Sequence, residues 1–326
     1  MTASSRFSET MESSFLTAVL LPLALFIIML GMGLGLTIRD FKQIFVAPKA
    51  VILGLIAQLV MLPIVGFGLA SIFPLAPELA VGVMILAACP GGALSNLMTY
   101  IARGNVALSI ALTAISSLIT IFTIPLVVNF SMQVFMGEAT ALHLPFWQTV
   151  MKIAVITLIP VSLGMLLNHY RPRFAASVEK SVKWLSLFFL GLIIAIIVVQ
   201  ERANIVDFFL QVGWVMLALN VITMSLGFAI ATLAQLNRST TKALTIEVGL
   251  QNGTLAIAVA SAPLFLNNPS MAIPPAIYSL IMDVTGFAFA LWCQGQTGTM
   301  NPAPTSSKDE ALAQVVMPHS SGSDDA

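Results

Sequence analysis

The sequence predicts an all-α protein that crosses a membrane about nine times. Apolar residues make up 58% of the 326 residues, charged residues only 9%, and the mean hydropathy is +0.97. Soluble globular domains carry roughly 25% charged residues. The apolar residues also gather into stretches of about 20, the helix length that spans the hydrocarbon core of a bilayer. Composition therefore excludes an ordinary soluble domain, and the net charge of zero gives no indication of a nucleic-acid partner.

Nine stretches have the length and hydropathy of membrane spans. We expect a polar tail over residues 1–14, a membrane domain over residues 15–295, and a disordered tail rich in Ser, Pro, Thr and Asp over residues 296–326. The expected spans are residues 15–37, 50–73, 79–101, 105–129, 147–168, 182–200, 209–235, 242–262 and 274–295.

Basic residues gather on one side of these spans. Of the fourteen lysines and arginines, all but Arg6, Lys152 and Arg202 lie in alternate loops or in the C-terminal tail. Cytoplasmic loops carry an excess of basic residues, and an odd number of spans places the two ends of a chain on opposite sides. We therefore expect a multi-pass protein of the cell membrane with its N-terminus outside and its C-terminus in the cytoplasm.

Two of the expected spans are interrupted. The third contains AACPGGALSN over residues 87–96, and the eighth contains ALTIEVGLQNGT over residues 243–254. A helix in lipid tolerates such a break only where the freed backbone groups find protein, water or ions. The third and eighth spans also run in opposite directions, as the matching segments of inverted repeats do, and paired interrupted segments of this kind indicate a transporter site. A packing kink is the alternative for Pro90 to Gly92, because proline and glycine are common in membrane helices.

The eighth span carries a carboxylate, Glu247. A charged side chain at this depth costs at least ~2.5 kcal/mol, so it normally faces a partner, an ion or water. The structural alternative is an ion pair or a protonated, hydrogen-bonded acid. Lys242 lies five residues earlier and does not share a helical face with Glu247. The pattern therefore favours ion binding.

Other oxygen-bearing side chains lie within the expected spans. Ser109 and Thr113 are four residues apart and share one helical face. Any single Ser or Thr commonly bonds its own helix or a neighbour, but several such oxygens with a carboxylate and unwound carbonyls are what a sodium site needs. For Asp283, a second carboxylate in a span, substrate contact, proton site and buried neutral acid all stay open. The full set is Gln58, Ser95, Asn96, Ser109, Thr113, Ser116, Ser117, Glu247, Gln251, Asn252 and Asp283.

The sequence gives little indication of a resident metal, a cofactor or an enzyme. The two cysteines and three histidines stand apart, without metal-ligand spacing. One alternative is an arsenite-type exporter with Cys89 as a soft thiolate ligand. Another is an intramembrane hydrolase with Glu247 and Asp283 as paired carboxylates, although no nucleophile motif supports it.

Two segments, ACPGGALSNLMTYIARGNVALS and KALTIEVGLQNG, resemble the signature regions of the bile acid:sodium symporter family, and the similarity extends from Met29 to about Gln294. The resemblance implies a sodium-dependent organic anion transporter of the nine-span form, built from inverted repeats. It implies a panel domain near residues 15–49 and 147–208 and a core domain near residues 50–130 and 209–295. Two broken helices would cross in the core, beside two sodium ions.

The resemblance also assigns residues to these ions. It implies a first sodium site formed by Ser95, Asn96, Ser109, Thr113 and Glu247. It implies a second site formed by Gln58, Glu247, Gln251 and the carbonyls of Val248 and Leu250.

On the substrate side the sequence departs from the bile acid pattern. Ala93 stands where bacterial bile acid transporters of the family typically have Thr, and Met282 and Asp283 stand where they have a His-Asn pair. We therefore expect a smaller carboxylate, of the pantoate or pyruvate class, as cargo. Helix N-termini hold anions well, so we expect Gly92, Ala93, Asn252 and Gly253 at the two breaks to bind the substrate. The resemblance adds Met282 and Asp283 of the last span as substrate-binding residues.

Overall fold

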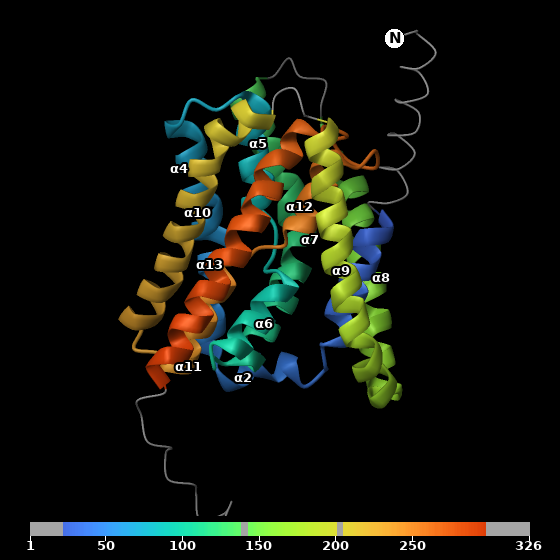
Figure 1. Cartoon of the computed structure of the whole chain (residues 1–326), viewed down its shortest axis with the longest axis vertical. Helices are drawn as coiled ribbons and strands as arrows, with labels where there is room; N and C mark the ends of the chain where they lie inside the picture. The colour runs from blue at the N-terminus through green and yellow to red at the C-terminus, as the bar shows by residue number, and fades with distance from the viewer. Residues whose placement is uncertain (1–21, 138–142, 201–204, 298–326) are drawn as a thin grey trace, which may run out of the picture.

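The computed structural model describes residues 22–137, 143–200 and 205–297, and within these ranges the protein is helical, without a β-strand (Figure 1). The expected tail over residues 1–14, the start of the first span, and residues 298–326 lie outside the described residues. The prediction of an all-α polytopic membrane protein is confirmed. Five described helices are long and apolar enough to cross a bilayer, and three shorter apolar helices accompany them.

Each expected span corresponds to one helix or to a pair of helices. The bounds are Pro22–Leu34, η1 Asp40–Lys42, α2 Gln43–Val46, α3 Pro48–Ile56, the π-helical η2 Ala57–Met61, α4 Leu62–Ile72, α5 Pro77–Ala87, α6 Ala93–Ile101, α7 Val106–Met136, α8 Phe146–Tyr170, α9 Pro172–Gln200, α10 Ile205–Leu233, α11 Arg238–Gly249, α12 Gly253–Ser261, η3 Ser270–Ala272 and α13 Ile273–Thr297.

Helix ends differ from the expected span ends by several residues. Helix α9 begins ten residues before the expected span, at Pro172, and α7 continues to Met136, seven residues beyond it. Hydropathy marks only the part of a helix that lies in lipid, whereas backbone hydrogen bonding continues until a breaker or a loop ends it. Helix α13 likewise extends to Thr297, two residues into the expected tail.

The two interrupted spans lie at the centre of the bundle. Every residue of α12 is buried, as is every residue of α5 from Leu79 to Ala87. Helices α4, α10 and α13 lie on one side of them, and α8, α9 and the Pro22–Leu34 helix lie on the other (Figure 1). The outer helices carry large exposed apolar side chains, such as Ile64, Trp214 and Val284, as lipid-facing surfaces do.

The basic loops lie at one end of the bundle. The η1–α2 segment, the C-terminal end of α6, the junction of α8 and α9 and the start of α11 all lie at the lower end in Figure 1. Two of these loops are joined directly, because Asn105 N donates a hydrogen bond of 2.9 Å to Ser239 O. The alternate loops that carry the basic residues therefore lie together at one end of the molecule.

Helices α10 and α11 approach so closely that their backbones touch. A Cβ atom on Gly227 of α10 would lie 2.8 Å from Leu244 O and 3.1 Å from Thr245 Cα of α11. Helix association in lipid depends on packing, and small residues allow it.

Gly227→Ala is therefore expected to destabilise the protein by roughly 1–3 kcal/mol, because backbone atoms cannot yield as a side chain does. Gly68→Ala is the matched control, since a Cβ at Gly68 meets no atom within 4 Å. Thermal unfolding in detergent measures both variants. Equal melting temperatures for the two would contradict the close approach.

Candidate functional site

The two broken helices meet and complete each other's hydrogen bonding. Gly92 N donates to Leu250 O at 3.0 Å, and Asn252 N donates to Pro90 O at 2.8 Å. Between these bonds, Gly91 and Gln251 form an isolated antiparallel bridge. Backbone groups that lose their helical partners at one break thus find partners in the other break, as interrupted membrane helices require. The predicted crossing of the two broken helices is confirmed.

Four helix ends surround this crossing. Helices α6 and α12 begin there, and α5 and α11 end there. Because the N-terminus of a helix carries partial positive charge and the C-terminus partial negative charge, one side of the crossing favours anions and the other favours cations. Asn252 caps α12 by accepting a hydrogen bond of 3.0 Å from Leu255 N, whereas no side chain of the described residues caps α6.

Glu247 lies in the last turn of α11 and is fully buried. Its Oε2 accepts hydrogen bonds from Ser95 Oγ at 2.7 Å and Ser109 Oγ at 2.6 Å. Its Oε1 accepts one from Thr113 Oγ1 at 2.5 Å. Sequence spacing predicted the shared face of Ser109 and Thr113, but Ser95 joins them only through the crossing.

Lys242 does not pair with Glu247. Its Nζ donates to Ala102 O at the C-terminal end of α6, at 2.8 Å. Within the described part of the chain, Glu247 thus has hydroxyl partners and no cationic one, which argues against the structural ion pair. A buried carboxylate in such surroundings needs further compensation for its charge.

Gly91 brings the backbone against this carboxylate. A Cβ atom at Gly91 would collide with Glu247 Oε1 and would lie 3.0 Å from Gln58 Nε2. Only glycine leaves room for the broken helix to pass here.

A second polar group lies beside Glu247. Gln58 occupies the π-helical segment η2, and its Nε2 lies 3.3 Å from Gln251 Oε1. Gln251 Nε2 donates to Val248 O at 2.8 Å, while Leu250 O accepts the bond from Gly92 already described. No sequence pattern indicated the π-helical turn, although such turns often occur at functional sites.

Two oxygens near these groups have no partner. Gln58 Oε1 and Asn96 Oδ1 are buried and accept no hydrogen bond within the described structure. An unsatisfied buried acceptor costs about 1–3 kcal/mol. Such atoms fit a cation or an ordered donor, because they offer lone pairs and no proton.

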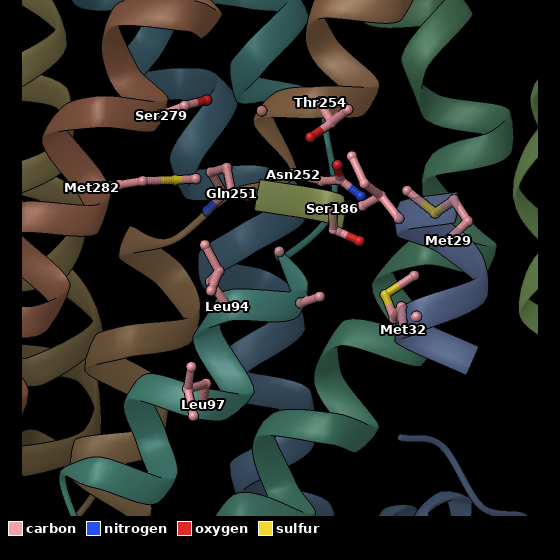
Figure 2. Close-up of a pocket in the computed structure, with 15 residues that line it drawn as sticks. Met29, Met32, Leu94, Leu97, Ser186, Gln251, Asn252, Thr254, Ser279 and Met282 are labelled. Atoms are coloured by element: carbon pink, nitrogen blue, oxygen red, sulfur yellow. The ribbon is translucent and has the colours of Figure 1, made fainter. Parts of the chain in front are cut away.

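A cavity of about 140 Å³ lies against the crossing (Figure 2). Five of the predicted substrate residues line it, namely Gly92, Ala93, Asn252, Gly253 and Met282. Asp283 does not line it, and its Oδ1 is buried without a hydrogen-bond partner among the described residues. A role for Asp283 in substrate contact therefore stays a prediction without geometric support.

Sequence reasoning missed several lining residues. Thr254 and Ser279 could have been found, because they lie one and three positions from Gly253 and Met282. Met29, Met32 and Ser186 gave no signal, since tertiary packing alone brings the Pro22–Leu34 helix and α9 to the crossing (Figure 2).

A second cavity of about 200 Å³ adjoins the first. It lies between α7, α8 and η1, and it shares Met29, Met32 and Asn252 with the first cavity. No Lys, Arg or His is among the described residues that line either cavity. Nor do the described residues include a group of three or more His, Cys, Asp or Glu that could hold a metal ion.

Comparison with known proteins identifies the family. Residues 22–208 match the model of the sodium bile acid symporter family. The chain is also 35% identical over 267 residues to an uncharacterized sodium-dependent transporter of Bacillus subtilis (strain 168), covering 82% of this chain and 80% of the relative. The chain belongs to the sodium bile acid symporter family. The predicted family resemblance is confirmed.

Other members of the sodium bile acid symporter family are more distant. A probable chloroplastic sodium/metabolite cotransporter of Oryza sativa subsp. japonica is 31% identical over 265 residues, which cover 81% of this chain and 63% of the relative. The hepatic sodium/bile acid cotransporter of Rattus norvegicus is 28% identical over 265 residues, which cover 80% and 71%. These relatives are named sodium-dependent transporters or cotransporters, and membership of this family implies sodium as the coupling ion.

Gly91→Ala is expected to abolish or strongly reduce sodium-dependent transport, because the added methyl displaces the Glu247 carboxylate. Sodium-dependent uptake in proteoliposomes, at equal protein abundance, measures the effect, with Gly68→Ala as control. An unchanged sodium dependence in Gly91→Ala would show that the carboxylate tolerates displacement.

Proposed function

We propose that the protein is a secondary active symporter that moves a small organic anion together with two sodium ions by alternating access. The observation that carries the proposal is the fully buried Glu247 carboxylate, held by three hydroxyls beside two broken helices. A carboxylate at this depth is expensive unless a cation shares the site.

The first sodium ion would bind at the hydroxyl side of Glu247. Ser95, Ser109 and Thr113 already converge on the two carboxylate oxygens, at 2.5 to 2.7 Å. Asn96 Oδ1, on the same helix as Ser95, is buried without a partner among the described residues and would supply another ligand.

The second sodium ion would bind between Glu247 and η2. Gln58 Oε1 is the unpartnered acceptor on this side of the described structure. Gln251 and the carbonyls of Val248 and Leu250 would complete the set, because the C-terminal end of α11 presents partial negative charge there. Glu247 would serve both ions.

The anion would bind in the cavity at the crossing, where α6 and α12 begin. With no cationic side chain among the described lining residues, its charge would be balanced by helix N-termini, the Asn252 amide and the sodium ions. The cavity at the crossing has a volume of about 140 Å³. A small hydroxy or keto acid fits that space better than a sterol does.

Alternating access would be a movement of panel against core. The Pro22–Leu34 helix, α8 and α9 would form the panel, and the crossing helices with α4, α7, α10 and α13 the core. Both cavities lie between these groups. The basic loops would face the cytoplasm, with the N-terminus outside the cell membrane. Two sodium ions with a monoanion carry one net positive charge, which gains ~2.3 kcal/mol per 100 mV of membrane potential.

The rival functions find less support. Cys89 is buried and lines neither cavity, so it is poorly placed as a soft ligand for an arsenite-type exporter. The Glu247 carboxylate accepts hydrogen bonds from three hydroxyls, and Asp283 is not among its partners in the described structure. The two carboxylates therefore do not form the pair that an intramembrane hydrolase would need.

Glu247→Gln is expected to remove sodium-dependent uptake, because both proposed sites lose their only negative charge. Ser109→Ala and Thr113→Ala should each raise the sodium concentration for half-maximal uptake by a few-fold to about tenfold, since each removes one neutral oxygen. Sodium titrations in proteoliposomes at equal abundance compare them. Normal sodium dependence in Glu247→Gln would refute the proposed sites.

The cargo is tested by competition and by two variants. Small hydroxy and keto acids, such as pantoate and pyruvate, should compete with one another for uptake, and bulky bile acids should compete weakly. Asn252→Ala should weaken binding of every cargo, whereas Asp283→Asn should keep or improve the affinity for an anion, because it removes a like charge near the cavity.

The opposite pattern would overturn the cargo assignment. Efficient bile acid uptake by the unmodified protein, without competition from acids of pantoate or pyruvate size, would show that Ala93 and Met282 do not select against large substrates.

A further inference from the structure

A buried hydrogen-bond network surrounds the tip of α11, and its residues line neither cavity. It joins Asn220 of α10, Tyr278 and Thr285 of α13, and the carbonyl of Gly249, the last residue of α11. Asn220 and Tyr278 are 0% exposed, and neither lines a cavity. Buried polar side chains in a membrane protein are costly and are usually hydrogen-bonded or functional. Here Asn220 and Tyr278 both donate to a single backbone oxygen.

The Gly249 carbonyl accepts two hydrogen bonds from two different helices. Tyr278 Oη donates at 2.7 Å, and Asn220 Nδ2 donates at 3.0 Å. Thr285 Oγ1 lies 2.7 Å from Asn220 Oδ1, closer than to the two carbonyls of its own helix, Ile281 O at 2.9 Å and Met282 O at 3.2 Å. A hydrogen bond to Asn220 Oδ1 favours the amide orientation that directs Nδ2 at Gly249 O. Carbonyls in the last turn of a helix lack intrahelical donors, but one donor would satisfy Gly249. The second donor fixes its direction.

The carbonyls on either side of Gly249 point elsewhere. Val248 O accepts from Gln251 Nε2, and Leu250 O accepts from Gly92 N at the crossing. Leu250 has extended backbone angles, φ −106° and ψ 105°, so the chain turns out of the helix at this point. Because peptide units are planar, holding the Gly249 carbonyl toward α10 and α13 also limits how its two neighbours can rotate.

We propose that Asn220 and Tyr278 are positioning residues for the second sodium ion. By holding Gly249 O toward α10 and α13, they keep the carbonyls of Val248 and Leu250 directed at the site beside Gln58 and Gln251. The inference rests on the proposed two-sodium function, and it adds residues that touch neither the ion nor the cargo.

The packing around Gly249 supports a rigid tip. A Cβ atom on Gly249 would collide with Met224 Cγ of α10, so the tip lies directly against α10. With Gly227 against Leu244 further along the pair, α11 is held to α10 at two levels. Small residues permit this close contact. The hydrogen bonds from Asn220 and Tyr278 then set the direction of the Gly249 carbonyl.

The experiment titrates sodium as a stabilising ligand of the detergent-purified full-length protein, which needs no knowledge of the cargo. Melting temperatures are measured across sodium concentrations, with choline holding ionic strength constant. Tyr278→Phe removes only Oη, and Thr285→Val frees Asn220 while leaving both donors to Gly249 in place. Ser131→Ala is the matched control, since Ser131 is buried and bonds only its own helix, at Val128 O.

Tyr278→Phe should raise the sodium concentration for half-maximal stabilisation about threefold to tenfold and reduce the steepness of the titration, because one of two sites weakens. Thr285→Val should shift it in the same direction by a smaller factor. Ser131→Ala should titrate like the unmodified protein.

A purely structural role predicts a different result. Tyr278→Phe would then melt lower in choline yet keep the half-maximal sodium concentration unchanged, and that outcome overturns the proposal. If Tyr278→Phe does not fold, an unchanged titration in Thr285→Val overturns it equally. Loss of sodium stabilisation in Glu247→Gln beside a normal titration in Tyr278→Phe would leave the proposed function standing and remove this inference alone.

Discussion

The mutual hydrogen bonding of the two broken helices is the constraint on which the rest of the structure depends. A chain that leaves helical geometry inside a bilayer exposes backbone groups that lipid cannot satisfy. Here Gly92 and Asn252 donate to Leu250 and Pro90, so each break completes the other. The two segments must therefore lie at the centre of the bundle, where α5 and α12 are buried almost throughout, and the remaining helices cover them.

Helix ends also set the local charge around the crossing, since no Lys, Arg or His is among the described residues that line the two cavities. Two helix N-termini and two helix C-termini meet within one small region, so anion-favouring and cation-favouring surfaces lie side by side. The Glu247 carboxyl group lies in the last turn of α11, where three hydroxyls contact it. In the proposed function, an anion and sodium would stabilise one another across the crossing, which would couple their binding.

Rigidity around the crossing comes from close backbone contact and from buried polar bonds. Gly91 lacks the Cβ atom that would collide with the Glu247 carboxylate, and Gly227 lacks the Cβ atom that would keep α10 away from α11. Asn220 and Tyr278 fix the carbonyl at the tip of α11. The proposed alternating access would require the proposed ion sites to keep their shape while other helices move, and these contacts join helices of the proposed core.

The amino-acid sequence alone was enough to predict the helical class, the approximate spans, the two breaks and a carboxylate, Glu247, within a span. Those features follow from local composition: apolar length for the spans, Pro90 to Gly92 and Asn252 to Gly253 for the breaks, and the energetic cost of Glu247 in lipid. The known family signatures then assigned Gln58 and Asn96, whose unpartnered oxygens fit that assignment among the described residues. The family resemblance had grouped Ser95 and Ser109 with Glu247, and the structure shows that both hydroxyls contact one carboxylate oxygen. The tertiary structure was needed to show that Met29 and Ser186 line the cavity and that Asp283 does not. These contacts join residues far apart in the chain or depend on the rotation of a helix, which hydropathy and spacing along one segment do not fix.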